Sequence, residues 1–204
     1  MTTALKQRAR LWLAHPVVPL TARALEDLAR SGLTAEDAHA RGIVGLPPVF
    51  GQPRDDYRIP YHDRHGRKTG FYRDKLFGRA KQKYDQASAP GSHWYLDPTL
   101  PWDAVFRDPS HTLIFTEGEK KAMCACKHGF YTIGLGGVWN WKTARQPMPE
   151  LDEVDWQGRD VVVCYDSDLA RKYFIRHARE RLTAQLLQRG ALVRYAELLD
   201  GVAA

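Results

Sequence analysis

Apolar and polar residues alternate most regularly in the last ninety or so residues of the chain. Four short apolar runs, each bounded by turn residues, are typical of strands buried within a sheet: 112–116, 130–135, 160–165 and 191–198. Residues 118–128 and 170–189 lie between these runs and place apolar side chains at helical spacing. This alternation predicts an α/β domain over 111–204, with a mostly parallel four-stranded sheet flanked by helices.

The preceding residues follow two other patterns. Residues 1–50 are predicted to form a helical segment, in which Thr21 and Thr34 are suitable N-caps for two short helices. Residues 51–110 instead alternate turn signals with short β-like pieces, at 57–59, 70–73 and 93–96. We therefore expect a helical segment, a small β-rich module and an α/β domain, in this order.

Basic residues are concentrated in the predicted β-rich module and indicate a function for it. The chain of 204 residues has a formal net charge of +6, and ten of its basic residues lie from Arg54 to Lys83, opposed by only four aspartates. Six aromatic residues are interleaved with these charges, from Tyr57 to Tyr84. Cations that bind phosphates, beside aromatic rings that stack on unpaired bases, are typical of proteins that bind single-stranded nucleic acid. The candidate nucleic-acid-binding residues are Arg58, Arg64, Arg67, Lys68, Tyr72, Arg73, Lys75, Lys81 and Lys83. In the alternative interpretation, the aromatic side chains form the core of a small sheet and the charges are only solvated.

The cysteines and the N-terminal residues indicate the compartment. Cys124, Cys126 and Cys164 have no disulfide-framework spacing, and we expect them to be reduced and largely buried. The only apolar run near the N-terminus, 11–20, is short and is interrupted by a histidine and two prolines, unlike a signal peptide or a membrane span. We therefore expect a soluble, cytoplasmic protein with no membrane partner.

Carboxylates follow two of the predicted strands. Glu117 comes directly after 112–116, and Asp166 and Asp168 come directly after 160–165. Ligands bind outside the carboxyl ends of the strands in an open parallel sheet, and residues two apart on an extended chain point the same way. Three carboxylates gathered there repel one another unless a cation lies among them, and oxygen ligands suit Mg²⁺ or Mn²⁺. The sequence thus predicts a site for Mg²⁺ or Mn²⁺, with turn capping as the alternative role of the two aspartates.

The residues after the second predicted strand are candidates for nucleotide contact. Gly136 and Gly137 lie there, and glycines at such a place let backbone N–H groups approach a phosphate. A tight turn is the alternative interpretation of this glycine pair. Trp139 and Trp141 follow, and they either stack on a base or close the end of the sheet.

Two segments resemble a known family. Thr116–Ala122 (TEGEKKA) and Tyr165–Ala170 (YDSDLA) are similar to the two signatures of the Toprim domain, which bacterial-type primases, topoisomerases and some nucleases share. The form Asp-x-Asp-x-Ala resembles the primase version. Further segments resemble phage and plasmid primase–helicase replication proteins, so that the resemblance covers most of the chain: 25–33, 59–61, 83–86 and 134–141.

The resemblance implies a role for each acid. Glu117 would be the general base, or a ligand that helps to deprotonate an attacking hydroxyl. Asp166 and Asp168 would hold the divalent ions of a phosphoryl-transfer reaction. Lys120 and Lys121 would lie in the first turn of the next helix, where they either contact phosphate or face solvent.

The chain also departs from the family pattern. Primases usually have an acid at the position of Lys121 and a glycine at the position of Arg171. The added positive charge either strengthens the binding of phosphate or marks a domain that binds without catalysis. No set of cysteines and histidines has the spacing of the zinc ribbon that precedes the catalytic part of bacterial primases.

The favoured hypothesis is a module of a phage or plasmid (mobile-element) replication protein with metal-dependent, primase-type nucleotidyl transfer on single-stranded DNA. Its partners would be single-stranded DNA or RNA, nucleotides, and a helicase domain or subunit. Two alternatives remain open: a metal-dependent Toprim nuclease, and a non-catalytic module that binds single strands or nucleotides. Because the chain stops directly after the fourth predicted strand, we also expect it to be a piece of a longer protein.

Overall fold

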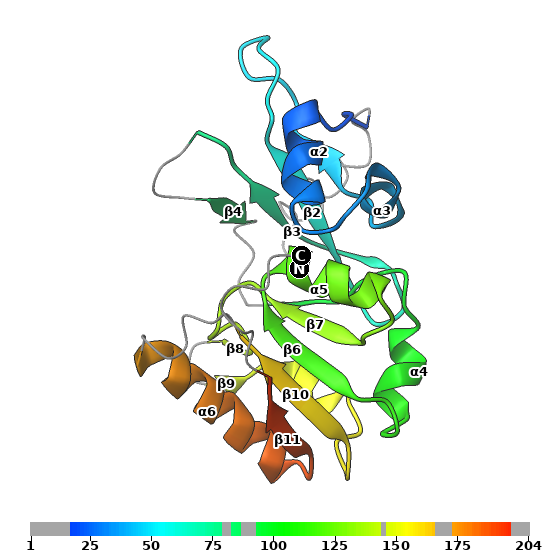
Figure 1. The fold of residues 1–204 in the computed structure, drawn as a ribbon, viewed down its shortest axis with the longest axis vertical. Helices are drawn as coiled ribbons and strands as arrows, with labels where there is room; N and C mark the ends of the chain where they lie inside the picture. Colours follow the sequence, from blue (N-terminus) through cyan, green and yellow to red (C-terminus); the bar gives the residue numbers. More distant parts are fainter. Residues whose placement is uncertain (1–16, 79–82, 87–92, 144–145, 166–172, 197–204) are drawn as a thin grey trace, which may run out of the picture.

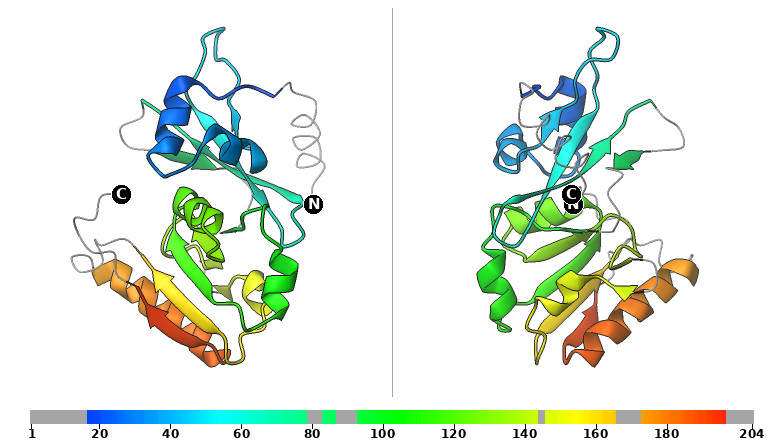
Figure 2. Two further views of the ribbon diagram at one scale, coloured as in Figure 1. Left: turned by 45° about the vertical axis from the view of Figure 1, so that its right-hand side comes forward. Right: turned by 180° about the vertical axis from the view of Figure 1, so that it is seen from behind.

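Two sheets, one above the other in Figure 1, divide the molecule into a smaller and a larger half. The structure is a computed structural model, which describes residues 17–78, 83–86, 93–143, 146–165 and 173–196. The smaller half holds a four-stranded sheet and two helices, and the larger half holds a five-stranded sheet with helices on both faces (Figures 1 and 2). This is the mixed α/β architecture that the sequence predicts.

The two N-terminal helices begin at the predicted N-caps. Helix α2 (Ala22–Ala29) follows Thr21, whose side chain accepts a hydrogen bond from the backbone N–H of Ala24 at 3.3 Å. Helix α3 (Ala35–Ala40) follows Thr34, which forms a capping box with Asp37. Each cap satisfies backbone N–H groups that the first turn of a helix leaves without partners.

The smaller sheet is antiparallel and has the order β1-β2-β3-β4. Its strands are β1 (Val44–Gly45), β2 (Tyr57–His62), β3 (Lys68–Lys75) and β4 (Tyr84–Gln86). Tyr57, Ile59 and Tyr61 alternate along β2 and are buried against Leu28 and the other apolar residues of α2 and α3. The first two predicted β-like pieces, at 57–59 and 70–73, therefore lie in this sheet.

The larger sheet has the order β11-β10-β6-β7-β5. Four of its strands are parallel and coincide with the four predicted runs: β6 (Leu113–Glu117), β7 (Thr132–Leu135), β10 (Asp160–Cys164) and β11 (Leu192–Tyr195). The fifth strand, β5 (Trp94–Tyr95), pairs antiparallel with β7. The prediction of a four-stranded sheet was therefore one strand short. The predicted β-like piece at 93–96 contains this strand, but its sequence neighbours had assigned it to the β-rich module.

Helices and short elements cover the two faces of the larger sheet. Helix α6 (Tyr173–Gln188) packs on the face that carries Phe115 and Val163. The same core contains residues of α4 (Trp102–Arg107), of the 3₁₀ helix η1 (Pro149–Asp152) and of the segment around the hairpin of β8 (Lys142–Thr143) and β9 (Gln146–Pro147). Helix α5 (Glu119–Lys127) covers the other face, where a Cβ atom added to Gly134 would lie 3.1 Å from Ala122. Glycine at this position lets α5 approach the sheet closely.

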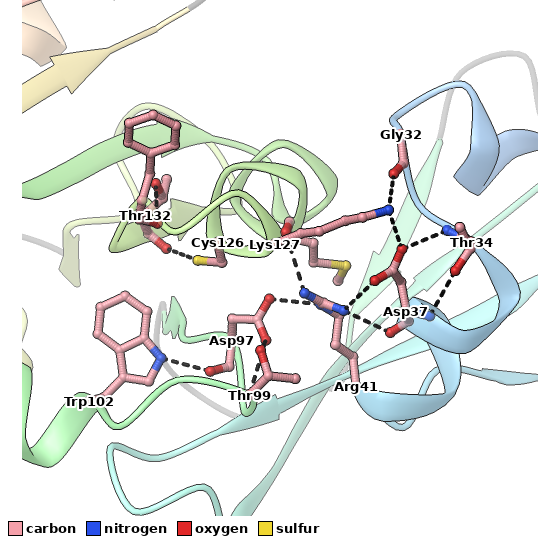
Figure 3. A network of polar contacts seen from close by, with 12 residues as sticks. Gly32, Thr34, Asp37, Arg41, Asp97, Thr99, Trp102, Cys126, Lys127 and Thr132 are labelled. Carbon is pink, nitrogen blue, oxygen red and sulfur yellow. Dashed lines mark hydrogen bonds and ion pairs between the residues drawn. The ribbon is translucent and has the colours of Figure 1, made fainter.

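A network of polar contacts joins the two halves (Figure 3). Arg41, after α3, donates to Asp97 at 2.7 Å, and both side chains are almost completely buried. Asp97 also accepts from Thr99 at 2.7 Å. Lys127, at the end of α5, reaches back to Asp37 of α3 at 2.7 Å. Paired and hydrogen-bonded in this way, the buried charges fix how α3 lies against α5 and the larger sheet.

None of the helices in the described part of the chain has the length and apolar character that a membrane span requires.

Candidate functional site

The carboxyl end of β6 positions the first predicted acid. Strand β6 ends at Glu117, and Gly118, with a φ of 93°, turns the chain into α5. Such a positive φ favours glycine. Thr116 pairs with Cys164 in the last register position of β6 and β10, so the chain leaves β10 beside Glu117. Glu117 therefore lies at the end of the sheet where parallel strands bind ligands.

Asp166 and Asp168 lie outside the described residues, so their roles remain predictions. The residue that precedes them, Tyr165, is fully buried. Burial first, and the negative charge of Glu117 second, hold the pKa of Tyr165 well above its usual value. Glu117 is therefore close enough to Tyr165 for its charge to shift the pKa of that residue. The two aspartates follow Tyr165 in the sequence.

A metal ion at this end of the sheet would need ligands from both strands. In the described ranges, no three His, Cys, Asp or Glu side chains lie close enough together to hold a metal ion. Glu117 would supply one carboxylate, and Asp166 and Asp168 would supply the others. The chemistry of this donor set, oxygen ligands that follow two neighbouring parallel strands, fits Mg²⁺ or Mn²⁺.

The smaller sheet reaches the same end of the larger sheet through Arg73 of β3. Nη1 of Arg73 lies 2.6 Å from Oε1 of Glu119, the first residue of α5, which is 1% exposed. The hydroxyl of Tyr61 donates a second hydrogen bond to this carboxylate. The Arg73 guanidinium lies 4.5 Å from the centre of the Tyr84 ring, and a Cβ atom added to Gly136 would lie 2.8 Å from Nη1. A cation of the β-rich module, which is also the basic module of the chain, is therefore held against the turn that follows β7.

Burial and charge act in opposite directions on this group. Burial disfavours the charged form of Arg73, but the carboxylate of Glu119, together with Tyr61 and Tyr84, outweighs burial and holds the pKa of Arg73 above its usual value. Burial and the same carboxylate raise the pKa of Tyr61 well above its usual value. Arg73 is therefore charged and Tyr61 is a neutral hydrogen-bond donor over the whole physiological range of pH.

Three other predicted nucleic-acid-binding cations have acidic partners. The pairs are Arg58 with Asp74 at 2.7 Å, Arg67 with Asp63 at 2.8 Å, and Arg64 with Asp103 at 3.3 Å. The Arg58 guanidinium also lies 3.4 Å from the centre of the ring of Tyr72. The positive charge of the β-rich module is thus partly neutralised within the protein, which the sequence count of charges does not reveal.

The lysines of the module have different surroundings. Nζ of Lys75 lies 5.2 Å from the centre of the Tyr84 ring, and burial lowers the pKa of Lys75. Lys68 and Lys83 are exposed, whereas Lys81 lies outside the described residues. Arg73, Lys75 and Tyr84 therefore gather on β3 and β4, which are neighbouring strands.

The predicted phosphate-binding residues are dispersed. Nζ of Lys120 lies 2.9 Å from Asp27 of α2, so this lysine attaches the smaller half to α5. Lys121, next along the helix, is exposed, and Arg171 lies outside the described residues. Sequence neighbours on α5 thus face different surroundings.

The turn after β7 contains the glycine pair. Asn140 donates a backbone hydrogen bond to the carbonyl of Gly137 at 2.8 Å, which closes a tight turn. Gly136 is approached by Arg73, as described above, while a Cβ atom added to Gly137 would meet nothing closer than the Asn140 side chain at 3.8 Å. Trp141 is 4% exposed and packs in the core, whereas Trp139 is only partly buried at its margin.

Glu119 is a site residue that the sequence alone does not indicate. Its place directly after Glu117-Gly118 marked it only as part of a motif, and its partners lie 46 and 58 positions away along the chain. A carboxylate in the first turn of a helix is a common surface feature. Only the fold brings Arg73 and Tyr61 to it.

Comparison with known proteins agrees with this architecture. The family model described as "Domain of unknown function (DUF3854)" matches residues 101–202, half of the chain. An uncharacterized protein of Picosynechococcus sp. (strain ATCC 27264 / PCC 7002 / PR-6) is 34% identical over 79 residues, which cover 33% of this chain and 8% of that protein. The chain thus spans a small part of the length of this curated relative.

Two solved structures have a similar fold. One is the DnaG primase catalytic domain bound to single-stranded DNA (17% identity), and the other is a DNA primase domain from Pseudomonas aeruginosa (19% identity). Each aligns with 97% of this chain and with 71% of its own chain, with a TM-score of 0.62. The chain therefore has a primase-type fold.

Proposed function

Because this chain belongs to the DUF3854 family and has the fold of DNA primase catalytic domains, we propose that it is a primase-type module of a replication protein. Its activity is nucleotidyl transfer on single-stranded DNA, dependent on Mg²⁺ or Mn²⁺. The observation that carries this proposal is the position of Glu117, at the carboxyl end of β6 and beside the point where the chain leaves β10. The DnaG structure with bound single-stranded DNA supports the same class of template here.

Glu117, Asp166 and Asp168 form the reaction centre in this proposal. Divalent ions bound by these carboxylates would neutralise the phosphates of the incoming nucleotide. Glu117 accepts the proton of the attacking hydroxyl or orients it. The backbone fixes its place, because the N–H of Gly118 donates to the carbonyl of Leu135 at 2.7 Å.

The basic module holds the template beside this centre. Arg73 is a cation that lies against the turn after β7, and Glu119 and Tyr61 hold it there. Lys75 and Tyr84 extend the same surface along β3 and β4 with one cation and one aromatic ring. Such a mixture suits the phosphates and unpaired bases of a single strand.

The wider setting is also part of the proposal. The chain aligns with 71% of each primase structure and with 8% of the curated relative, so the activity and partners of the whole protein are part of the proposal. We place the module in a phage- or plasmid-type replication protein, with a helicase domain or subunit as partner.

One observation favours a second function, binding without catalysis. Lys121 is exposed on α5, four residues after Glu117. The primase signature usually has an acid at the position of Lys121. A module that lost one acid of its centre would still bind single strands through β3 and β4.

The two functions differ in one assay. The full chain is incubated with single-stranded DNA, labelled NTPs or dNTPs, and Mg²⁺ or Mn²⁺. Glu117→Gln and Asp166→Asn are compared with Asp160→Asn, which changes an acid at the opposite end of β10. We expect metal-dependent synthesis that both centre variants reduce at least a hundredfold and that Asp160→Asn preserves.

Other outcomes identify the alternatives. Metal-dependent cleavage of the template without added nucleotides, lost in the same variants, would indicate a nuclease. DNA binding without synthesis or cleavage, unchanged in every variant, would exclude catalysis and leave the binding module.

A further inference from the structure

An aromatic strip runs along one side of the larger half and consists of Tyr173 and His177 of α6 together with Trp139. The rings of Tyr173 and His177 are almost parallel, with an interplanar angle of 4° and 6.1 Å between their centres. The ring of Trp139 lies 5.6 Å from that of His177. Lys142 adds a cation, with Nζ 4.5 Å from the centre of the Trp139 ring. Three rings and one ammonium group from two separate segments thus form a continuous row.

Exposure distinguishes this strip from a core cluster. Tyr173 is 74% exposed and His177 is also exposed, whereas Trp141, two residues after Trp139, is 4% exposed. Of the two tryptophans, Trp141 therefore closes the sheet and Trp139 continues the row to the surface. Contiguous exposed apolar groups are typical of surfaces that bind a ligand or a partner.

The strip lies at the carboxyl end of the larger sheet, as the candidate centre does. Strand β7 ends at Leu135, and the segment that follows passes towards β10, because the Tyr165 hydroxyl donates to the carbonyl of Val138 at 3.4 Å. Tyr173 is the first residue of α6, the helix that follows β10. This helix covers the face of the sheet opposite to α5, away from α2, α3 and the smaller sheet (Figures 1 and 2).

Among the described residues of α6 and of the segment around Trp139, cations outnumber acids. Lys142 lies against Trp139, and the exposed side chains of Arg176 and Arg181 lie on the same helix as His177. From Tyr173 to Gln188, Glu180 is the only acidic residue of α6. A polyanion with flat groups is complementary to such a surface, since its phosphates meet the cations and its bases meet the rings.

We propose that the aromatic strip binds a single-stranded nucleic acid by base stacking, as a second contact surface across the candidate centre from the basic module. The inference rests on the proposed function only in that the chain must bind single strands. It adds a path: the strand passes from β3 and β4, over the carboxyl end of β6, to the strip on α6. Stacking on the strip does not require particular bases, because every base has a π-face.

A probe without bases separates stacking from charge. The affinity of the full chain for an oligothymidylate is compared with its affinity for an oligonucleotide of the same length that has abasic sites throughout. We expect the double variant Trp139→Ala/His177→Ala to bind the oligothymidylate roughly tenfold more weakly and to bind the abasic strand as the natural protein does. Trp139→Phe, which keeps an aromatic face, should retain most of the affinity.

Phe130→Ala is the matched control. Phe130 is 57% exposed, but it lies before β7, at the opposite end of the sheet. Its removal should leave the affinity for both probes unchanged. His177→Ala and Tyr173→Ala, at exposed positions, should each show part of the loss even if the double variant folds poorly.

The outcomes separate this inference from the proposed function. Equal binding of oligothymidylate by the natural protein and by folded strip variants would overturn the strip while leaving the primase proposal in place. Loss of binding to both probes alike would also overturn stacking, because charge alone would explain it. Failure of the natural protein to bind any single strand would overturn both, and self-association lost in the strip variants would assign the surface to a second copy of the chain.

Discussion

The two ends of the larger sheet use charged side chains in opposite ways. At the amino end of β10, Arg159 is completely buried and donates hydrogen bonds to four backbone carbonyls. At the carboxyl end, Glu117 lies beside the exit of β10, and Arg73 approaches from a different sheet. One end is closed around its cation, and the other brings charged groups from distant segments together.

Helix α5 connects the two ends, since it begins at Glu119 and finishes at Lys127. Both ends of α5 contact the smaller half, through Arg73 at one end and through Asp37 at the other. We expect changes at the amino end to alter the free energy of unfolding, and changes at the carboxyl end to alter binding or catalysis.

Replacing Arg159 should have the largest effect on stability. Arg159→Met keeps the apolar stem but removes the donor to the carbonyls of Asp155, His111 and Val105, while the carbonyl of Phe106 keeps its bond from the N–H of Asp155. Each buried polar group without a partner costs about 1 kcal/mol or more, so we expect a loss of roughly 3–5 kcal/mol in the free energy of unfolding. Denaturant titration measures this loss.

Arg194→Met provides the control. Arg194 is 64% exposed, and its ion pair with Asp160 at 3.1 Å joins neighbouring strands on the surface. Exposed pairs contribute about 1 kcal/mol or less. A comparable loss of unfolding free energy in both variants would mean that the buried hydrogen bonds of Arg159 stabilise the fold no more than an exposed ion pair does.

The pH dependence of stability should reveal the contact between Asp37 and Lys127, at the C-terminal end of α5. Burial opposes the charge of Asp37, but hydrogen bonds from Lys127 and Thr34 outweigh burial and lower the pKa of Asp37 to about 2. A lowered pKa in the folded state stabilises the fold above pH 4, and this contribution is lost as the pH falls from about 4 to about 2.

Asp37→Asn removes this titration. The variant should be less stable than the natural protein by about 1–2 kcal/mol at pH 6, and the difference should shrink as the pH approaches 2. Unfolding free energies of both proteins at pH 6, 4 and 3 measure it. A difference that stays constant with pH would show that the carboxylate charge is not what holds α3 to α5.

How much of this organisation the sequence predicts depends on the distance between partners along the chain. The four parallel strands were predicted because each is a local apolar run, and the N-caps Thr21 and Thr34 because each cap lies three residues from its partner. The β-like piece at 93–96 was predicted but assigned to the wrong sheet, because its pairing with β7 joins residues about 40 positions apart.

The site was predicted in the same uneven way. The position of Glu117 at the end of a buried strand follows from local sequence, whereas the contact between Arg73 and Glu119 spans 46 positions and two sheets. The pairing of Arg58 with Asp74 likewise appears only once β2 and β3 are aligned. A count of charges therefore overestimates how much positive charge the basic module offers to a ligand.

The smallest predicted effect tests the carboxyl end through one methyl group. In Gly136→Ala the new Cβ atom would lie 2.8 Å from Nη1 of Arg73, so the guanidinium must move away from the turn. We expect about fivefold weaker binding of single-stranded DNA and a loss of stability as well, because Nη1 of Arg73 is also paired with the buried carboxylate of Glu119. In Gly137→Ala the nearest atom is 3.8 Å away, and binding should not change.

A double-mutant cycle assigns this effect to Arg73. If Gly136→Ala acts by displacing the guanidinium, its effect should vanish in an Arg73→Ala background, since nothing is left to displace. Residues in direct contact show such coupling, while independent sites give additive changes. Additive losses would mean that the turn after β7 and Arg73 act on binding independently, and that Gly136→Ala does not act by displacing the guanidinium.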